Sequence, residues 1–233
     1  MTHDAIIVGG GLAGSTLAKN LAERGYRVLV LERESRFRDR VRGEQMHPWG
    51  VSAGRRLGIY DPLAAGCGNQ TRWWTTWLGG NPVFSRDLQA TAPHGAGSFN
   101  LYHPAMQEIL LELAEKAGAE VQRGTAAGSV IPGSPPKVQY RSQGKTVSVE
   151  ARIVVGADGR NSHVRSAAGF QVNRDPDRLM IAGLLCEGVP APEDATHHGV
   201  GSGGATLIAP LGQKRARLYF MYRKGRRCSR NER

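Results

Sequence analysis

The feature that most constrains the fold of this chain is a glycine-rich turn near its N-terminus, placed between two elements of opposite periodicity. Residues 5–8 are all apolar and predict a buried strand, and glycines follow at positions 9, 11 and 14. From Leu12 to Arg24 apolar residues recur at helical spacing, and Gly25 predicts the end of that helix. Residues 27–32 then predict a second strand, which ends in an acid, so the segment as a whole predicts a β-α-β unit.

Each glycine of this turn has its own physical role if the unit binds a dinucleotide. Gly9 allows the tight turn, Gly11 lets a pyrophosphate approach the backbone, and Gly14 lets the helix pack closely on the strand. Glu32 is placed to accept hydrogen bonds from a ribose, and its charge disfavours a 2′-phosphate. We therefore expect a site for FAD or NAD that is formed by Gly9, Gly11, Leu12, Ala13, Gly14, Glu32 and Arg33.

The bulk composition predicts a globular protein of one domain or slightly more. The chain has 233 residues, 40% of them hydrophobic, and contains no apolar run as long as a membrane span. Glycines interrupt the apolar run at the N-terminus, so we expect a strand there and no signal peptide. The three cysteines are far apart and lack CxxC spacing, which predicts no metal site and no disulfide framework. A cytoplasmic protein is the expectation.

The net charge of +11 is concentrated at the C-terminal end. Residues 213–233 hold nine basic residues and one acid, a net charge of +8, which leaves +3 for the first 212 residues. A mildly basic body without a stripe of basic and aromatic residues predicts no specific nucleic-acid partner. The end itself is interpreted as disordered or foreign sequence, and the alternative is a tail that binds polyanions without specificity.

Periodicity predicts further elements along the chain. A loop is expected from Arg33 to Glu44, and the other expected elements are a helix from Pro48 to near Gly58, a strand at 71–78, a helix from His103 to Gly118, a strand at 120–123, a hairpin of residues 137–142 and 145–150, and a separate strand at 151–155. Later β-like runs at 178–187, 205–209 and 217–222 predict the beginning of a sheet-based domain.

Two clusters of side chains need interpretation. Trp73, Trp74 and Trp77 either form the wall of a pocket for a flat substrate or fill a core. The pairs Glu193-Asp194 and His197-His198 lack the spacing of metal ligands, and we interpret both pairs as exposed residues of a loop.

A second motif, Gly156-Ala157-Asp158-Gly159-Arg160, follows the strand expected at 151–155. Together with the glycine turn and Glu32, it resembles the FAD-dependent aromatic hydroxylases, the group A flavoprotein monooxygenases of the para-hydroxybenzoate hydroxylase type, over most of residues 4–169. The resemblance implies an α/β fold with a Rossmann-like (GR2-type) FAD-binding domain at residues 1–170, in which the segment at about 60–100 contributes to the substrate side. A partial β-sheet substrate domain at 171–222 and a basic, disordered tail at 223–233 complete this division.

The resemblance also implies roles for single residues. Gly9, Gly11, Gly14 and Glu32 would contact the phosphates and ribose of FAD. Arg42 would lie close to the flavin, and His103 stands where the family often has an arginine or glutamine that reaches FAD. Asp158 and Gly159 would position the pyrophosphate and NAD(P)H. The alternatives are a solvated loop arginine for Arg42, an ordinary first-turn residue for His103 and a helix cap for Asp158.

By this resemblance the activity is that of an NAD(P)H-dependent monooxygenase, in which a flavin C4a-hydroperoxide transfers oxygen from O2 to a small organic substrate such as an aromatic. No catalytic side chain is predicted, because the cofactor carries the chemistry. The family's later Gly-Asp motif is not found after Gly169, so a truncated, non-catalytic FAD-binding fragment is one alternative. A related flavoprotein of the halogenase or isoprenoid reductase type is another, and a basic nucleic-acid-binding module is a third.

Overall fold

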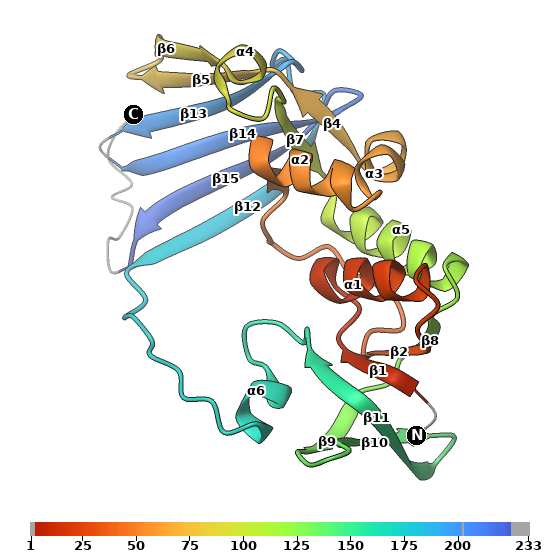
Figure 1. The fold of residues 1–233 in the computed structure, drawn as a ribbon. Coiled ribbons are helices and arrows are strands. Elements are labelled where there is room, and N and C mark those ends of the chain that lie inside the picture. The colour runs from red at the N-terminus through yellow and green to blue at the C-terminus, as the bar shows by residue number, and fades with distance from the viewer. Residues whose placement is uncertain (1–2, 202, 225–233) are drawn as a thin grey trace. The chain divides into compact units, whose positions relative to one another are not determined.

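The computed structural model describes residues 3–201 and 203–224, and Figure 1 traces their path. The chain forms two compact units, the first from Met1–Asp39 and Pro104–Asn173, the second from Arg40–His103 and Arg174–Arg233. The basic end predicted to be disordered lies almost entirely outside the described residues. Within the described part of the chain, none of the helices is both long enough and apolar enough to cross a membrane.

The first unit is built on parallel strands that begin with the predicted β-α-β segment. β1 (His3–Val8) pairs in parallel with β2 (Val28–Glu32) on one side and with β11 (Lys145–Gly156) on the other. β8 (Glu120–Arg123) extends the sheet beyond β2, also in parallel. The sheet order is β8-β2-β1-β11-β10-β9, with β1 at the centre of the parallel part. This arrangement confirms the α/β, Rossmann-like fold class.

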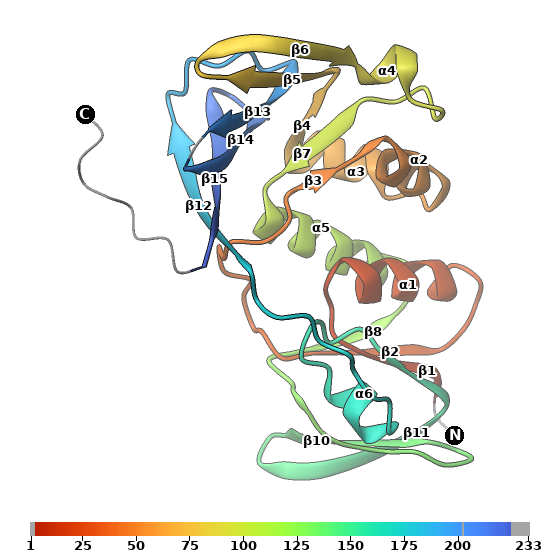
Figure 2. The ribbon, with the colours of Figure 1, turned by 90° about the vertical axis from the view of Figure 1, so that its left-hand side faces the viewer.

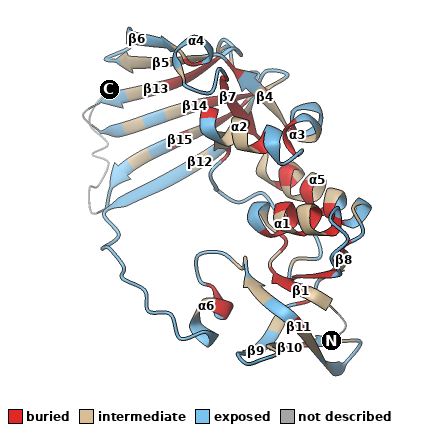
Figure 3. Ribbon diagram, in the orientation of Figure 1, coloured by how far each residue is buried: buried red, intermediate tan, exposed pale blue. Residues whose placement is uncertain are grey.

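Successive side chains of β1 and β2 point to opposite faces of the sheet, so the core of this unit has two layers. Ile7 and Val30 pack against α1 (Leu12–Ala22) and α5 (His103–Lys116), which Figures 1 and 2 show on the same side of the strands. Ile6 and Leu29 point the other way, toward β10 (Lys137–Ser142) and α6 (His163–Ala167). Figure 3 shows burial concentrated in β1, β2 and the facing sides of the two long helices. The apolar runs therefore form strands buried on both faces.

The prediction of a hairpin followed by a separate strand at 151–155 was wrong in one respect. β11 is a single strand of 12 residues, antiparallel to β10 through residues 145–150 and parallel to β1 through residues 151–156. β9 (Ala127–Ile131) completes the antiparallel part. Glu150 and Ala151 are consecutive, and no glycine, proline or typical turn residue occurs between residues 149 and 155, so the extended backbone continues from one pairing into the other.

The second unit contains a six-stranded sheet and a three-stranded sheet. The large sheet has the order β12-β15-β14-β13-β5-β6, antiparallel except where β13 meets β5. Its strands are β5 (Trp73–Leu78), β6 (Asn81–Asp87), β12 (Leu179–Glu187), β13 (Ala195–Gly201), β14 (Gly204–Gly212) and β15 (Arg215–Arg223). The small sheet has β7 (Ser98–Leu101) between β3 (Gln45–Met46) and β4 (Gly68–Thr71), and the helices are α2 (Pro48–Arg56), α3 (Tyr60–Gly66) and α4 (Leu88–Thr91).

The interpretation of both histidines as exposed loop residues was wrong. His197 and His198 lie on β13, and His197 is buried. The run at 195–201 combines histidines and glycines without a clean alternation, so its strand character comes from pairing with β5 and β14. Glu193 and Asp194 are exposed, as predicted.

Candidate functional site

The turn between β1 and α1 requires glycine at two positions for steric reasons. Gly9 has a φ of +106°, and a Cβ there would lie 2.4 Å from the carbonyl oxygen of Ala157. A Cβ on Gly14 would lie 1.9 Å from the carbonyl oxygen of Gly9. Backbone atoms cannot move aside as a flexible side chain can, so both glycines are needed for close packing within the turn.

Gly11 differs, because a Cβ at this position would meet nothing within 4 Å. Gly11 is the N-cap residue of α1. No side chain caps this end of the helix, and the first turn contains no acidic residue. Leu12 and Ala13 are exposed at the same end. The first backbone N–H groups of a helix lack intrahelical partners, and the helix dipole adds positive potential there. The arrangement fits a bound pyrophosphate.

Glu32 ends β2 beside this turn and is buried, with 6% of its surface exposed. Its Oε2 accepts a hydrogen bond from the backbone N–H of Gly10 at 2.7 Å, and its Oε1 accepts one from Glu34 N–H at 2.8 Å. Each carboxylate oxygen has a second lone pair, which suits a ribose hydroxyl. The neighbouring Arg33 is exposed, and its Nε lies 3.5 Å from a carboxylate oxygen of Glu34.

The second motif lies directly against the first, as the pairing of β1 with β11 requires. The backbone N–H of Ala157 donates to the carbonyl of Val8 at 2.8 Å, which continues the ladder past the end of the strands. Both motifs therefore occupy the carboxyl ends of neighbouring parallel strands, where ligands of open α/β sheets bind. Gly159 has a φ of +84°, and a Cβ there would meet nothing within 4 Å.

Asp158 has one satisfied and one unsatisfied oxygen. Oδ2 accepts hydrogen bonds from the backbone N–H groups of His163 at 2.6 Å and Val164 at 3.3 Å, so the residue does act as a cap for α6. Oδ1 is buried and has no hydrogen-bond partner among the described residues. Burial acts to raise the pKa of Asp158, but hydrogen bonds from Ser162 and the two amides outweigh it and lower that pKa. A charged carboxylate with a free acceptor fits a cofactor hydroxyl or an amide of a second ligand.

The other two predicted contacts, Arg42 and His103, belong to the second unit. The Arg42 residue is exposed, and its carbonyl lies 2.8 Å from the hydroxyl of Tyr219. The backbone N–H of His103 donates to Glu44 Oε1 at 3.0 Å. Both residues are thus held through their backbones, and their roles toward a cofactor stay predictions.

Glu44, which contacts the backbone of His103, and Tyr219, which contacts the backbone of Arg42, belong to a buried cluster that the sequence did not reveal. The carboxylate of Glu44 lies 2.5 Å from Nε of Arg217, and the hydroxyl of Tyr219 lies 2.8 Å from Oε2. Glu44 and Arg217 are 2% and 3% exposed. They are 173 positions apart, so no local pattern connects them. One signal was present, since Arg217 is a charged residue inside a run that predicts a strand.

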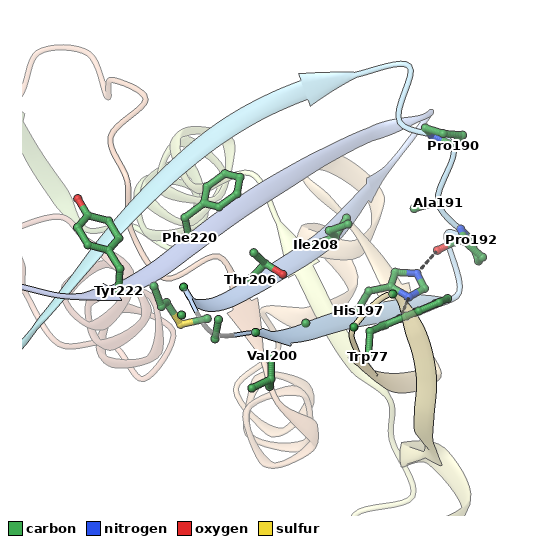
Figure 4. A pocket seen from close by; sticks show the side chains of 18 residues that line it. Trp77, Pro190, Ala191, Pro192, His197, Val200, Thr206, Ile208, Phe220 and Tyr222 are labelled. Atoms are coloured by element: carbon green, nitrogen blue, oxygen red, sulfur yellow. Dashed lines mark hydrogen bonds between the residues drawn. The ribbon is translucent and has the colours of Figure 1, made fainter. Parts of the chain in front are cut away.

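The tryptophan-rich strand β5 borders a cavity of about 780 Å³ on the large sheet. Trp77 lines it, and its indole Nε1 donates to Nδ1 of His197 at 3.3 Å. Figure 4 shows both rings at one end of the cavity. Trp74 lies elsewhere, with its ring near those of His47 and His198. Of the two interpretations of the tryptophans, the pocket wall therefore applies to Trp77.

Comparison with known proteins identifies relatives over nearly the whole chain. The family model described as "FAD binding domain" matches residues 2–225. Digeranylgeranylglycerophospholipid reductase 2 of Methanopyrus kandleri is 30% identical over 225 residues, which cover 94% of this chain and 54% of the reductase. A probable NADH-specific resorcinol 4-hydroxylase of Rhodococcus jostii is 28% identical over 207 residues, covering 79% of this chain and 39% of the hydroxylase.

Solved structures show the same fold. The p-nitrophenol 4-monooxygenase PnpA of Pseudomonas putida superposes with a TM-score of 0.81 at 17% identity, over 97% of this chain and 59% of that protein. The chain thus spans about half the length of the curated relatives it matches. The steric demand for Gly9 and Gly14, the open helix start at Gly11 and the family match agree, and the chain belongs to the FAD binding domain family.

Proposed function

We propose that the first unit binds the ADP half of FAD, and that the protein is an NAD(P)H-dependent monooxygenase acting with O2 on a small organic substrate. The observation that carries the proposal is the uncapped start of α1 at Gly11, open to solvent and adjacent to the buried carboxylate of Glu32. An anion at the helix start and a hydroxyl at the carboxylate are the two groups that an adenosine diphosphate presents.

The residues of the chain would bind and orient the cofactor. The amides of Leu12, Ala13 and Gly14 would donate to the pyrophosphate, and Glu32 would accept from the ribose. Gly159 leaves room for a close backbone approach, and the free Oδ1 of Asp158 would accept a further hydrogen bond. FAD, when bound, supplies hydride acceptance and the activation of oxygen.

The remaining predicted residues would act at the edges of this site. Arg33 is exposed and would lie at the solvent side of the adenosine. Arg42 and His103, whose backbones are held by Tyr219 and Glu44, are proposed as further cofactor contacts. An always-charged guanidinium at Arg42 suits a pyrophosphate or an anionic reduced flavin.

A second candidate function is the reduction of isoprenoid double bonds. It is favoured by the 30% identity to the Methanopyrus kandleri reductase over 94% of this chain. The resorcinol hydroxylase supports oxygenation of an aromatic ring at similar identity. The two functions differ in their need for O2, because an oxygenation consumes it and a reduction does not.

The cofactor proposal is tested by FAD titration of the purified chain, followed by flavin absorbance and fluorescence. Gly11→Ala should weaken FAD binding roughly tenfold or more, about 1.4 kcal/mol, because the methyl group occupies the approach path of the pyrophosphate. The matched control is Gly203→Ala, where a Cβ also meets nothing within 4 Å. Unchanged binding in Gly11→Ala, or an equal loss in both variants, would contradict the proposed site.

The activity is tested with the FAD-loaded protein, a resorcinol-type phenol or an isoprenoid lipid, and either nicotinamide cofactor. Substrate-dependent NAD(P)H oxidation with uptake of O2 and a hydroxylated product supports the monooxygenase. Anaerobic nicotinamide oxidation with a saturated lipid product supports the reductase instead. Tight FAD binding with neither product would leave the chain a cofactor-binding unit without the proposed activity.

A further inference from the structure

The cavity beside Trp77 lies on the opposite face of the large sheet from the buried Glu44 cluster. Residues directly paired across antiparallel strands share a face. Thr206 pairs with Phe220, whereas Leu207 pairs with Tyr219. Phe220 and Thr206 line the cavity, and Tyr219 contacts Glu44 on the other face. The cavity is therefore separate from the residues that hold Arg42 and His103.

One part of this face is hollow because the glycines there have no side chains. Gly199 pairs with Thr206, and a Cβ on Gly199 would lie 2.4 Å from the Thr206 hydroxyl. Gly201 pairs with Gly204, whose φ is +143° and whose Cβ would lie 2.2 Å from the carbonyl oxygen of Met221. All of these residues line the cavity. Gly204 is sterically required, because its φ is positive and its close neighbour is a backbone oxygen, whereas a side chain at 199 would displace the Thr206 hydroxyl. The floor without side chains is therefore formed by the glycines of the hairpin.

The wall at one end is held in a single arrangement. Nδ1 of His197 accepts from the indole of Trp77, so the imidazole carries its proton on Nε2, which faces the carbonyl of Pro192 at 3.4 Å. These contacts connect the loop at 190–192 to β13 and β5. Figure 4 shows Phe220 and Tyr222 on the same side of the sheet, toward the other end of the hollow. The cavity thus has aromatic groups at both ends and a flat floor between them.

The lining is uncharged, which limits the chemistry of an occupant. The described residues that line the cavity include no lysine, arginine, aspartate or glutamate. The ring nitrogens of Trp77 and His197 are paired with each other and with the carbonyl of Pro192, so the polar groups left to a ligand are the hydroxyls of Thr206 and Tyr222 and backbone atoms of the glycines. The volume of about 780 Å³ falls in the range of small-molecule sites. Binding an anion or a cation here would require desolvating it without a partner.

We propose that this cavity binds a neutral, planar, mostly apolar small molecule, at a site distinct from the cofactor site of the first unit. The ligand lies flat over the glycine floor, with its rings against Trp77 at one end and Phe220 at the other. Aromatic rings in such a cleft contribute through buried area and offset stacking. A hydroxyl or carbonyl on the ligand pairs with Thr206 or Tyr222.

The test uses anthracenemethanol as a neutral planar probe and anthracenecarboxylate as its charged counterpart, with the full chain and without added FAD. Binding is followed by quenching of tryptophan fluorescence, and Trp77→Phe identifies the part of the signal that comes from this site. We expect saturable binding of one neutral probe per chain. The carboxylate should bind roughly tenfold more weakly, because the cavity offers no cation.

Thr206→Trp fills the cavity and should weaken binding of the neutral probe roughly tenfold or more. The matched control is Leu184→Trp, a change on the same sheet face at an exposed residue that does not line the cavity. Circular dichroism of both variants checks that each is folded. Equal losses in the two variants, or no loss in Thr206→Trp, would overturn the proposal.

The remaining outcomes also decide the question. Light scattering measures whether the chain dimerises as its concentration rises. If the probe is released as dimers form, a second copy covers this face, and the proposal of a small-molecule site is overturned. Equal affinity for both probes would show adsorption without the proposed selectivity. FAD binds in the other unit under the proposal above, so failure of FAD binding leaves this test and its result unaffected.

Discussion

The glycine turn of the first unit and the Glu44 cluster of the second unit show two different ways to build a site. In the turn, the decisive contacts connect residues that are few positions apart, such as Gly9 and Gly14, or that lie on directly paired strands. In the cluster, Glu44 reaches Arg217 across 173 positions. The turn depends on the absence of side chains, and the cluster depends on the presence of charged ones. Sequence patterns describe the first kind of site well and the second kind poorly.

The largest expected effect comes from breaking the long-range site. Arg217→Met leaves the carboxylate of Glu44 buried without its cation, which should lower the free energy of unfolding by about 3–5 kcal/mol. Urea unfolding followed by circular dichroism measures it. The double variant Glu44→Gln/Arg217→Met removes both charges and should recover a substantial part of that loss. If the double variant is as unstable as the sum of the two single changes, the pair is not coupled.

A smaller loss of stability is expected when the local site, the glycine turn, is changed. Gly14→Ala places a methyl group 1.9 Å from a backbone oxygen, and the required shift should cost about 2–3 kcal/mol. The same substitution three residues earlier, at Gly11, meets open space and should leave the melting temperature unchanged. Differential scanning calorimetry of both variants separates a steric requirement of the fold from a requirement of the ligand. Equal destabilisation would argue against the different roles given to the two glycines.

Asp158, in the second motif of the first unit, predicts a pH-dependent effect on stability of intermediate size. Asp158→Ala should cost about 1 kcal/mol at neutral pH through lost capping of α6. The pKa of Asp158 is lowered in the folded protein, so its stabilisation is complete above the ordinary value of 3.8 and is lost as the pH falls through the lower folded value. The gap between wild type and variant in urea unfolding should therefore narrow below about pH 4. A gap that stays constant down to pH 3 would contradict a charge-dependent cap.

The last prediction concerns the reactivity of a thiol and leaves the free energy of unfolding unchanged. Burial raises the pKa of the Cys67 thiol in the second unit to about 12. Alkylation of Cys67 by iodoacetamide at pH 8 should be about 1,000-fold slower in the folded protein than in urea, because the thiolate is the reactive form and its fraction falls with the raised pKa. Peptide mass spectrometry quantifies the labelled fraction. Rapid labelling of the folded chain would mean that this region of the second unit opens readily.

The sequence predicted most of the first unit because its signals are local. Apolar runs flanked by glycines predicted β1 and β2, and helical spacing predicted α1 and α5. The continuous strand β11 was missed because alternation alone cannot show that one strand serves an antiparallel and a parallel partner in turn. β13 was missed because its pattern is irregular and its pairing comes from residues far away in the chain.

By itself the sequence determined the class of fold, the position of the glycine turn and the acid at Glu32, because steric limits and hydrophobic periodicity act over a few residues. Only the tertiary structure decided that Glu44 meets Arg217, that His197 is buried beside Trp77, and that glycines hollow one face of the large sheet. Burial and pairing of this kind depend on which distant strands become neighbours. That choice is made by the packing of whole layers, and no short stretch of residues contains it.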